Sequence, residues 1–169
     1  MLLPVAVTVG LYWYGRVHTP AYENSLFGQR GDDARLLKAQ LGSALLGLAL
    51  IQLFLALWMY GLPALRTAPH RVNTTHRLIG LTAFLLSLPI AQHCITTYGV
   101  QLTDTRVALH SLTGCFLYGA FVAKVIVVRH RHWPGWALPL AGGTLVTAIA
   151  LIWYAAALWY LNGFQAPGL

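Results

Sequence analysis

Two stretches of the sequence repeat a histidine followed four residues later by a glycine, His76 to Gly80 and His110 to Gly114. Each pair opens a long apolar run, and the first run carries a further histidine, His93, near its far end. Histidine is costly in hydrocarbon, and where it occurs there it usually faces the bundle interior and has a function. Because imidazole binds haem iron, these residue types predict a haem site.

The composition places these histidines in a membrane, since 57% of the 169 residues are hydrophobic and 9% are charged. A hydrocarbon core of about 30 Å needs about 20 helical residues. The runs that approach this length are 1–15, 39–62, 76–98, 106–128 and 136–161. Backbone groups in hydrocarbon must pair within their own segment. The sequence therefore predicts an all-α integral membrane bundle, a single domain of about five transmembrane helices, with the last four as a four-helix core.

The first run, residues 1–15, is short for a span, because it reaches only about 22 Å as a helix. We expect it to form a first helix that ends at the aromatic residues 12–14, which suit a membrane interface. Its shortness would fit a start upstream of Met1. It lacks a basic leader and a small-residue cleavage site, which disfavours a signal peptide.

The large polar loop, residues 16–38, holds three of the four acidic residues, Glu23, Asp32 and Asp33. We expect Asp32 or Asp33 to cap the second helix and Thr75 to cap the third. The formal charge of +7 comes from basic residues at helix ends and in loops, which argues against a nucleic-acid partner.

The orientation prediction rests on these basic residues, of which each side has five. The side with shorter loops and no acids is predicted to be cytoplasmic, which puts the 16–38 loop on the outer side of a bacterial inner membrane. The basic residues of that side are Arg66, Arg71, Arg77, Arg129 and Arg131.

His93 and His110 are predicted to lie at one depth in the bundle. Their helices, 76–98 and 106–128, are joined by a short loop and should pack antiparallel as neighbours. His93 lies five residues before the end of its run, and His110 lies four residues after the start of the next. Two imidazoles at one depth can hold a haem between helices, with Gly114 leaving room for the macrocycle. A polar contact across the helix pair is the alternative.

His76 needs a different partner, because it lies 17 residues from His93, about 25 Å along a helix. The nearest candidate in depth on the following helix is His130. A second haem between His76 and His130 is therefore one hypothesis, and an interfacial basic cluster around His130 is the other.

Three cations accompany the histidines. Lys124 lies nearly on the face of His110 and either extends to the interface or pairs with a haem propionate or an anionic substrate. Arg77 and Arg106 are further candidates for propionate binding, because each lies beside a histidine near a helix start.

With these residues, the chain resembles the b-type membrane cytochromes, including the ascorbate-dependent and ferric-reductase-like families. The likeness covers residues 76–130 through the elements His76 to Gly80, His93, and His110 to Gly114. It implies haem b and electron transfer across or along the membrane. Two-haem members carry a closer pair of histidines on each helix, a pattern from which this chain departs.

Residues 76–89 and 134–139 also look like a small, uncharacterised family of bacterial membrane proteins, a likeness that implies no activity. No flavin or nicotinamide fingerprint is present in the sequence. We therefore expect an electron-transfer subunit rather than a stand-alone enzyme.

The predicted electron-transfer partner is a protein, another subunit of a complex or a quinone. A protein partner should dock on residues 16–38 and 99–106, close to the predicted haem. That surface would include His18, Glu23, Asp32, Asp33 and Asp104.

Two other functions fit the sequence. One is a cofactor-free membrane anchor or assembly subunit of a larger complex, with its histidines bonded within the core. The other is a copper or zinc site built from His93, Cys94, His110 and Cys115.

Overall fold

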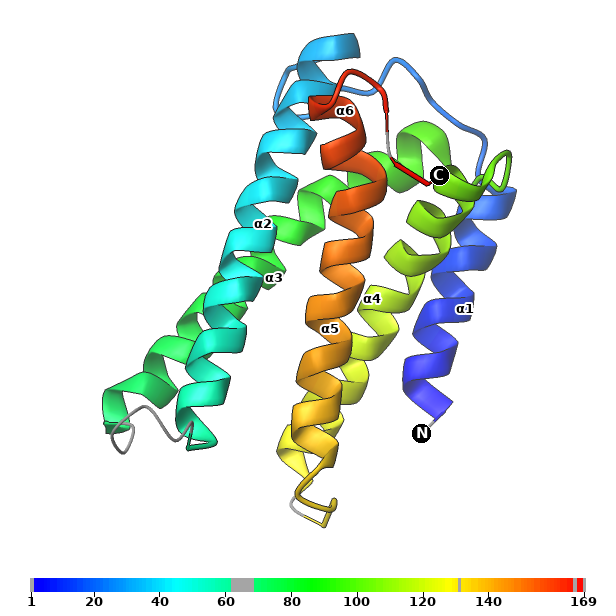
Figure 1. Cartoon of the computed structure of the whole chain (residues 1–169). Coiled ribbons are helices and arrows are strands. Elements are labelled where there is room, and N and C mark those ends of the chain that lie inside the picture. The colour runs from blue at the N-terminus through cyan, green and yellow to red at the C-terminus, as the bar shows by residue number, and fades with distance from the viewer. Residues whose placement is uncertain (1, 62–68, 131, 166, 169) are drawn as a thin grey trace.

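The apolar runs form helices that alternate in direction through an elongated bundle (Figure 1). The structure is a computed structural model and describes residues 2–61, 69–130, 132–165 and 167–168. Arg66 and Arg131, which entered the orientation prediction, lie outside the described residues. The helices are α1 (Leu2–Val17), α2 (Gly31–Met59), α3 (His70–Tyr98), α4 (Thr105–Arg129) and α5 (Ala137–Trp153), which continues through a π-helical segment (Tyr154–Leu158) into α6 (Trp159–Leu161).

Four of the helical stretches are long and apolar enough to cross a membrane: α2, α3, α4 and the continuous stretch Ala137–Leu161. The prediction of a helical membrane bundle is therefore confirmed. The π-helical segment does not break the last stretch, because the backbone stays helical on both sides of it. The 16-residue α1 is shorter than these four.

Helix α2 begins at Gly31, and the prediction that Asp32 or Asp33 caps it is wrong. Arg30 occupies the N-cap position and makes no side-chain cap bond. The Asp32 carboxylate instead pairs with Arg35 Nη1 at 2.7 Å, one turn along the helix. Both aspartates lie in the first turn, where the helix dipole stabilises their negative charge.

Helix α3 also begins earlier than predicted, at His70, so Thr75 is not its cap. The Thr75 hydroxyl donates to the Arg71 carbonyl at 3.0 Å from inside the helix. The polar residues after Pro69 contain no helix breaker, and a helix can begin directly after a proline. His76 therefore lies almost two turns inside α3 rather than at its start.

The order of packing places α5 between α2 and α4, with α1 on the outer side of α4 and α3 against α2 (Figure 1). The α4–α5 contact contains a tightly packed apolar cluster of Leu117, Ala120, Leu145 and Ala148. Small residues at such positions allow membrane helices to approach closely.

Helices α3 and α4 are antiparallel, but they meet through large side chains, while the described parts of their backbones scarcely approach each other. The rings of Phe84 and Phe121 stack with centroids 4.3 Å apart. The Tyr118 hydroxyl donates to the Ser87 carbonyl at 3.1 Å. We call these four residues the aromatic bridge. The close α3–α4 packing expected from the sequence is thus replaced by a side-chain contact midway along the helices.

Replacing Gly119 by alanine should push α1 away from α4. The added Cβ would lie 2.6 Å from the Pro4 carbonyl oxygen and would also meet the Thr8 hydroxyl. We expect unfolding in detergent to show a loss of about 1–3 kcal/mol, the usual cost of overpacking. Gly10→Ala is the control, because a Cβ there would meet nothing within 4 Å. The higher helix propensity of alanine should raise the free energy of unfolding of this variant by about 1 kcal/mol. Stabilisation by both changes would contradict the close α1–α4 contact.

Asp104 caps α4, and its contribution to stability should depend on pH. The Val107 N–H donates to its carboxylate at 2.9 Å and holds the pKa of Asp104 below its usual range. A lowered pKa gives stabilisation that is complete above the unfolded pKa and is lost as pH falls through the folded pKa. Asp104→Ala should therefore unfold more easily than the parent at neutral pH, and this difference should shrink in acid.

The matched variant is Asp104→Asn, which keeps a capping side chain that does not titrate. Its stability relative to the parent should rise as the pH falls. A parent–alanine difference that stays constant from neutral to acid pH would exclude this role of the carboxylate.

Candidate functional site

His93 lies in the last two turns of α3, beneath the loop that joins α1 to α2. Its side chain is buried, at 5% exposure. Its Nε2 lies 3.3 Å from the Asn24 carbonyl oxygen, which accepts a hydrogen bond from the protonated nitrogen. The loop is held over α3 because the Ala21 N–H donates to the Thr96 carbonyl at 3.1 Å. The Nδ1 atom of His93 is buried without a hydrogen-bond partner.

His110 lies in the second turn of α4, at the same end of the bundle as His93. Its ring contacts the backbone of Ile152 on α5. As in His93, Nδ1 is buried without a hydrogen-bond partner. One turn further along the same face, a Cβ on Gly114 would meet nothing within 4 Å. The space at Gly114 is therefore open.

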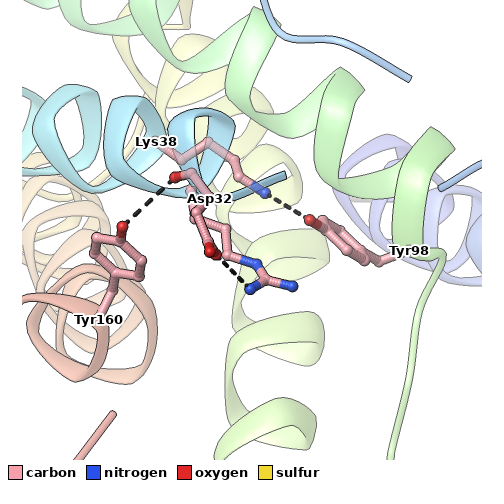
Figure 2. A network of polar contacts seen from close by, with 5 residues as sticks. Asp32, Lys38, Tyr98 and Tyr160 are labelled. Carbon is pink, nitrogen blue, oxygen red and sulfur yellow. Dashed lines mark hydrogen bonds and ion pairs between the residues drawn. The ribbon is translucent and has the colours of Figure 1, made fainter. Parts of the chain in front are cut away.

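Lys38 extends from α2 toward α3 at this end (Figure 2). Its Nζ donates to the Tyr98 hydroxyl at 3.3 Å and lies 4.4 Å from the centroid of the same ring. The charge of Lys38 acts on both His93 and His110. Side chains from α2, α3 and α4 thus meet in one region, which we call the His93–His110 site.

Arg106 adds a second cation to the His93–His110 site. Its Nη1 donates to the Ala155 carbonyl at 3.1 Å, and its guanidinium carbon lies 3.8 Å from the Trp159 ring centroid. No carboxylate balances these cations inside the bundle, because the four acidic residues of the chain are all exposed: Glu23, Asp32, Asp33 and Asp104. Two imidazoles and two cations fit a metal-containing group that carries anionic arms.

The copper or zinc site is not formed. Among the described histidine, cysteine and acidic side chains, no three come together as a metal-binding group. Cys94 follows His93 in a helix and so points about 100° away from it. Cys115 lies five residues after His110, about 140° around α4. The helix periodicity therefore separates each thiol from the neighbouring imidazole.

His76 lies at the opposite end of the bundle, where the charge of Lys124 acts on it. The Gln52 side chain on α2 donates to the His76 backbone carbonyl, and a Cβ added at Gly80 would lie in ordinary contact with the same glutamine. His76 Nδ1 is likewise buried without a partner. The aromatic bridge lies between this end and the His93–His110 site.

The other predicted residues at this end lie at the surface. His130 is the exposed C-cap residue of α4, and its Nδ1 is 3.1 Å from the Ile126 carbonyl of its own helix. Arg77 is also exposed. His130 therefore lies in an exposed environment, whereas the Nδ1 atom of His76 is buried. The ionisable side chain of α4 that acts on His76 is that of Lys124.

Sequence reasoning missed Lys38, Asn24 and Gln52. The sequence places Lys38 at the end of the polar loop 16–38, whereas in the structure it lies two turns into α2, at the depth of the two histidines. Asn24 and Gln52 act through contacts with His93 and His76 that depend on loop path and helix rotation. A depth comparison could have found Lys38, whereas the other two leave no signal in the sequence.

The comparison with known proteins identifies a family. No curated protein and no solved structure matches this chain. The family of unknown function DUF6529 matches residues 1–168, which is nearly the whole length. The chain therefore belongs to the family DUF6529, whose function is unknown.

Proposed function

We propose that this protein is a b-type cytochrome subunit of the membrane, with one haem held by His93 and His110, that passes electrons to or from a partner. The observation that carries the proposal is the pair of buried Nδ1 atoms without partners. They belong to helices α3 and α4 at one end of the bundle, within reach of the same lysine charge.

A ligand would remove the cost of these orphaned nitrogens. A buried polar atom without a hydrogen bond costs about 1–3 kcal/mol, and hydrocarbon offers no water to supply one. When Nε2 of His93 donates to the Asn24 carbonyl, Nδ1 keeps the lone pair that a metal ion accepts. A hydrogen bond on the second ring nitrogen also orients a ligating imidazole and raises its basicity.

The surrounding residues suit the rest of a haem. Lys38 and Arg106 can pair with its propionates, and the open space at Gly114 leaves room beside His110. The aromatic bridge lies on the deeper side of the His93–His110 site, and the loop over His93 lies on the outer side. A bound haem would supply one-electron chemistry, while the protein would hold and shield it.

The cofactor-free scaffold is the competing function, and the bond from His93 to Asn24 favours it. This contact ties the α1–α2 loop to α3, which is a structural task in itself. In a scaffold the histidines would only stabilise the fold. The two functions differ in whether the purified protein carries haem and in the effect of replacing either histidine.

Purified full-length protein from haem-replete cells should give the reduced-minus-oxidised spectrum of six-coordinate haem b. His93→Ala and His110→Ala should each lose this spectrum, because each removes one iron ligand. His130→Ala is the matched control and should keep it, since His130 is exposed. A colourless parent would overturn the cytochrome proposal, and intact assembly of all three variants would then favour the scaffold.

The electron-transfer partner should bind near the acidic residues at this end. Glu23 is exposed in the loop that covers His93, and Asp33 is exposed in the first turn of α2. Asp32 is engaged by Arg35, and the His18 ring lies 3.2 Å from the Thr96 carbonyl. Transient electron-transfer contacts are small and depend on complementary charge. Such a surface fits a basic soluble protein or the basic face of another subunit.

Neutralising Glu23 and Asp33 together, as Glu23→Gln with Asp33→Asn, should slow haem reduction by the partner several-fold at low salt. High salt should remove the difference, because it screens exposed charges. The haem spectrum should stay unchanged. Arg129→Gln changes a charge at the opposite end of the bundle and should leave the rate alone. Equal rates in parent and double variant would place electron entry elsewhere, such as from a quinone in the bilayer.

A further inference from the structure

The end of the bundle opposite the His93–His110 site holds a second polar group that the proposed haem does not use. It consists of His76 on α3, Lys124 on α4 and Gln52 on α2. The lysine charge acts on the imidazole, the ring contacts the Gln52 backbone, and the glutamine amide donates to the His76 carbonyl. We call these three residues the His76–Lys124 site.

Lys124 has no counterion in the described part of the chain. It is partly buried, and neither a hydrogen bond nor an ion pair engages it there. The Gln52 amide already donates to the His76 carbonyl, and the four carboxylates lie at the other end of the bundle, in residues 23–33 and at Asp104. An ammonium inside a membrane span is costly unless an anion accompanies it. An anion from outside the described chain would therefore lower this cost.

The depth of the site narrows the choice of anion. Lys124 lies five residues before the last residue of α4, Arg129, which is about 7.5 Å along the axis. His76 lies six residues after the first residue of α3, about 9 Å from that end. Both are thus within reach of the boundary between lipid headgroups and hydrocarbon. The exposed residues around this end include three arginines, Arg71, Arg77 and Arg129.

We propose that the His76–Lys124 site binds a phosphate group. Lys124 Nζ donates to the phosphate oxygens. The Nδ1 of His76, which is buried without a partner, donates the second bond once the negative charge of the phosphate favours protonation of the ring. Basic sites between transmembrane helices commonly take lipid headgroups in this way. The depth of the two residues favours an anionic phospholipid as the source of the phosphate, with free inorganic phosphate as the alternative source.

The test uses the purified full-length protein in a mild detergent with phosphatidylglycerol, phosphatidylcholine or inorganic phosphate added. Bound ligand is counted by native mass spectrometry, and unfolding is followed by thermal melting. The parent should bind phosphatidylglycerol in preference to phosphatidylcholine and melt at a higher temperature with it. Binding of inorganic phosphate alone, lost in the lysine variant, would support the site and identify free phosphate as its ligand.

Lys124→Met should lower the affinity for phosphatidylglycerol about tenfold, the effect of losing one hydrogen bond between charged groups. Without the lipid, the same variant should melt above the parent, because it no longer places an unpaired ammonium in the span. Lys124→Arg should restore binding. Arg71→Gln, which removes an exposed charge at the same end, should change the affinity less than twofold.

The proposal is overturned if Lys124→Met and the parent bind both phosphate sources equally, or if Arg71→Gln lowers binding as much as Lys124→Met. The second result would mean that only the general positive charge of this end matters. If Lys124→Met is unstable, His76→Gln provides a second test. This variant keeps a hydrogen-bonding side chain and should also weaken phosphate binding. The haem spectrum should be unchanged in these variants, which separates this test from that of the proposed function.

Discussion

The arrangement of the polar residues depends on the aromatic bridge between α3 and α4. The stacked rings of Phe84 and Phe121 and the bond from Tyr118 to Ser87 hold the two helices at the distance that large side chains set. The Tyr118 hydroxyl is satisfied by this bond, so it can lie inside the bundle without the penalty of an unpaired polar group. The bridge leaves His93 and His110 on one side and His76 and Lys124 on the other. The proposed ligand sites therefore lie at opposite ends of the bundle.

Charge is distributed unevenly between these two ends. The acidic residues lie outside the bundle at the end of the His93–His110 site, whereas Lys38, Arg106 and Lys124 reach inward from the helices. Lys38 and Arg106 find neutral partners in a tyrosine hydroxyl, a backbone carbonyl and aromatic rings. Neutral partners solvate a cation but do not cancel its charge, so both ends remain suited to anionic groups.

Helix α1 and the loop after it close one end of the bundle. Val100 N–H donates to the Gly15 carbonyl at 2.8 Å, which fixes the end of α1 against the turn between α3 and α4. A Cβ at Gly15 would lie 2.6 Å from the Val100 side chain, so only glycine allows this approach. From there the loop crosses α3 and reaches His93 through Asn24. The short first helix thus contributes by positioning the loop over the histidine.

The sequence by itself determined the helices and the depth of the histidines. Apolar length and the need to pair backbone groups in hydrocarbon leave only helices, and counting along two connected helices puts His93 and His110 at one end. Tertiary structure decided the rest. The early start of α3 at His70, the rotation that brings Lys124 to His76, and the loop contact of Asn24 depend on packing between segments distant in sequence. Residue spacing along one helix fixes the depth of each side chain and the angle between side chains. Which side chain of a second helix contacts a given residue depends on the rotation and the separation of the two helices. For that reason the sequence indicated the histidine pair and the candidate cations Arg106 and Lys124, whereas the contact of Lys38 with Tyr98 and the proximity of Lys124 to His76 emerged only from the folded bundle.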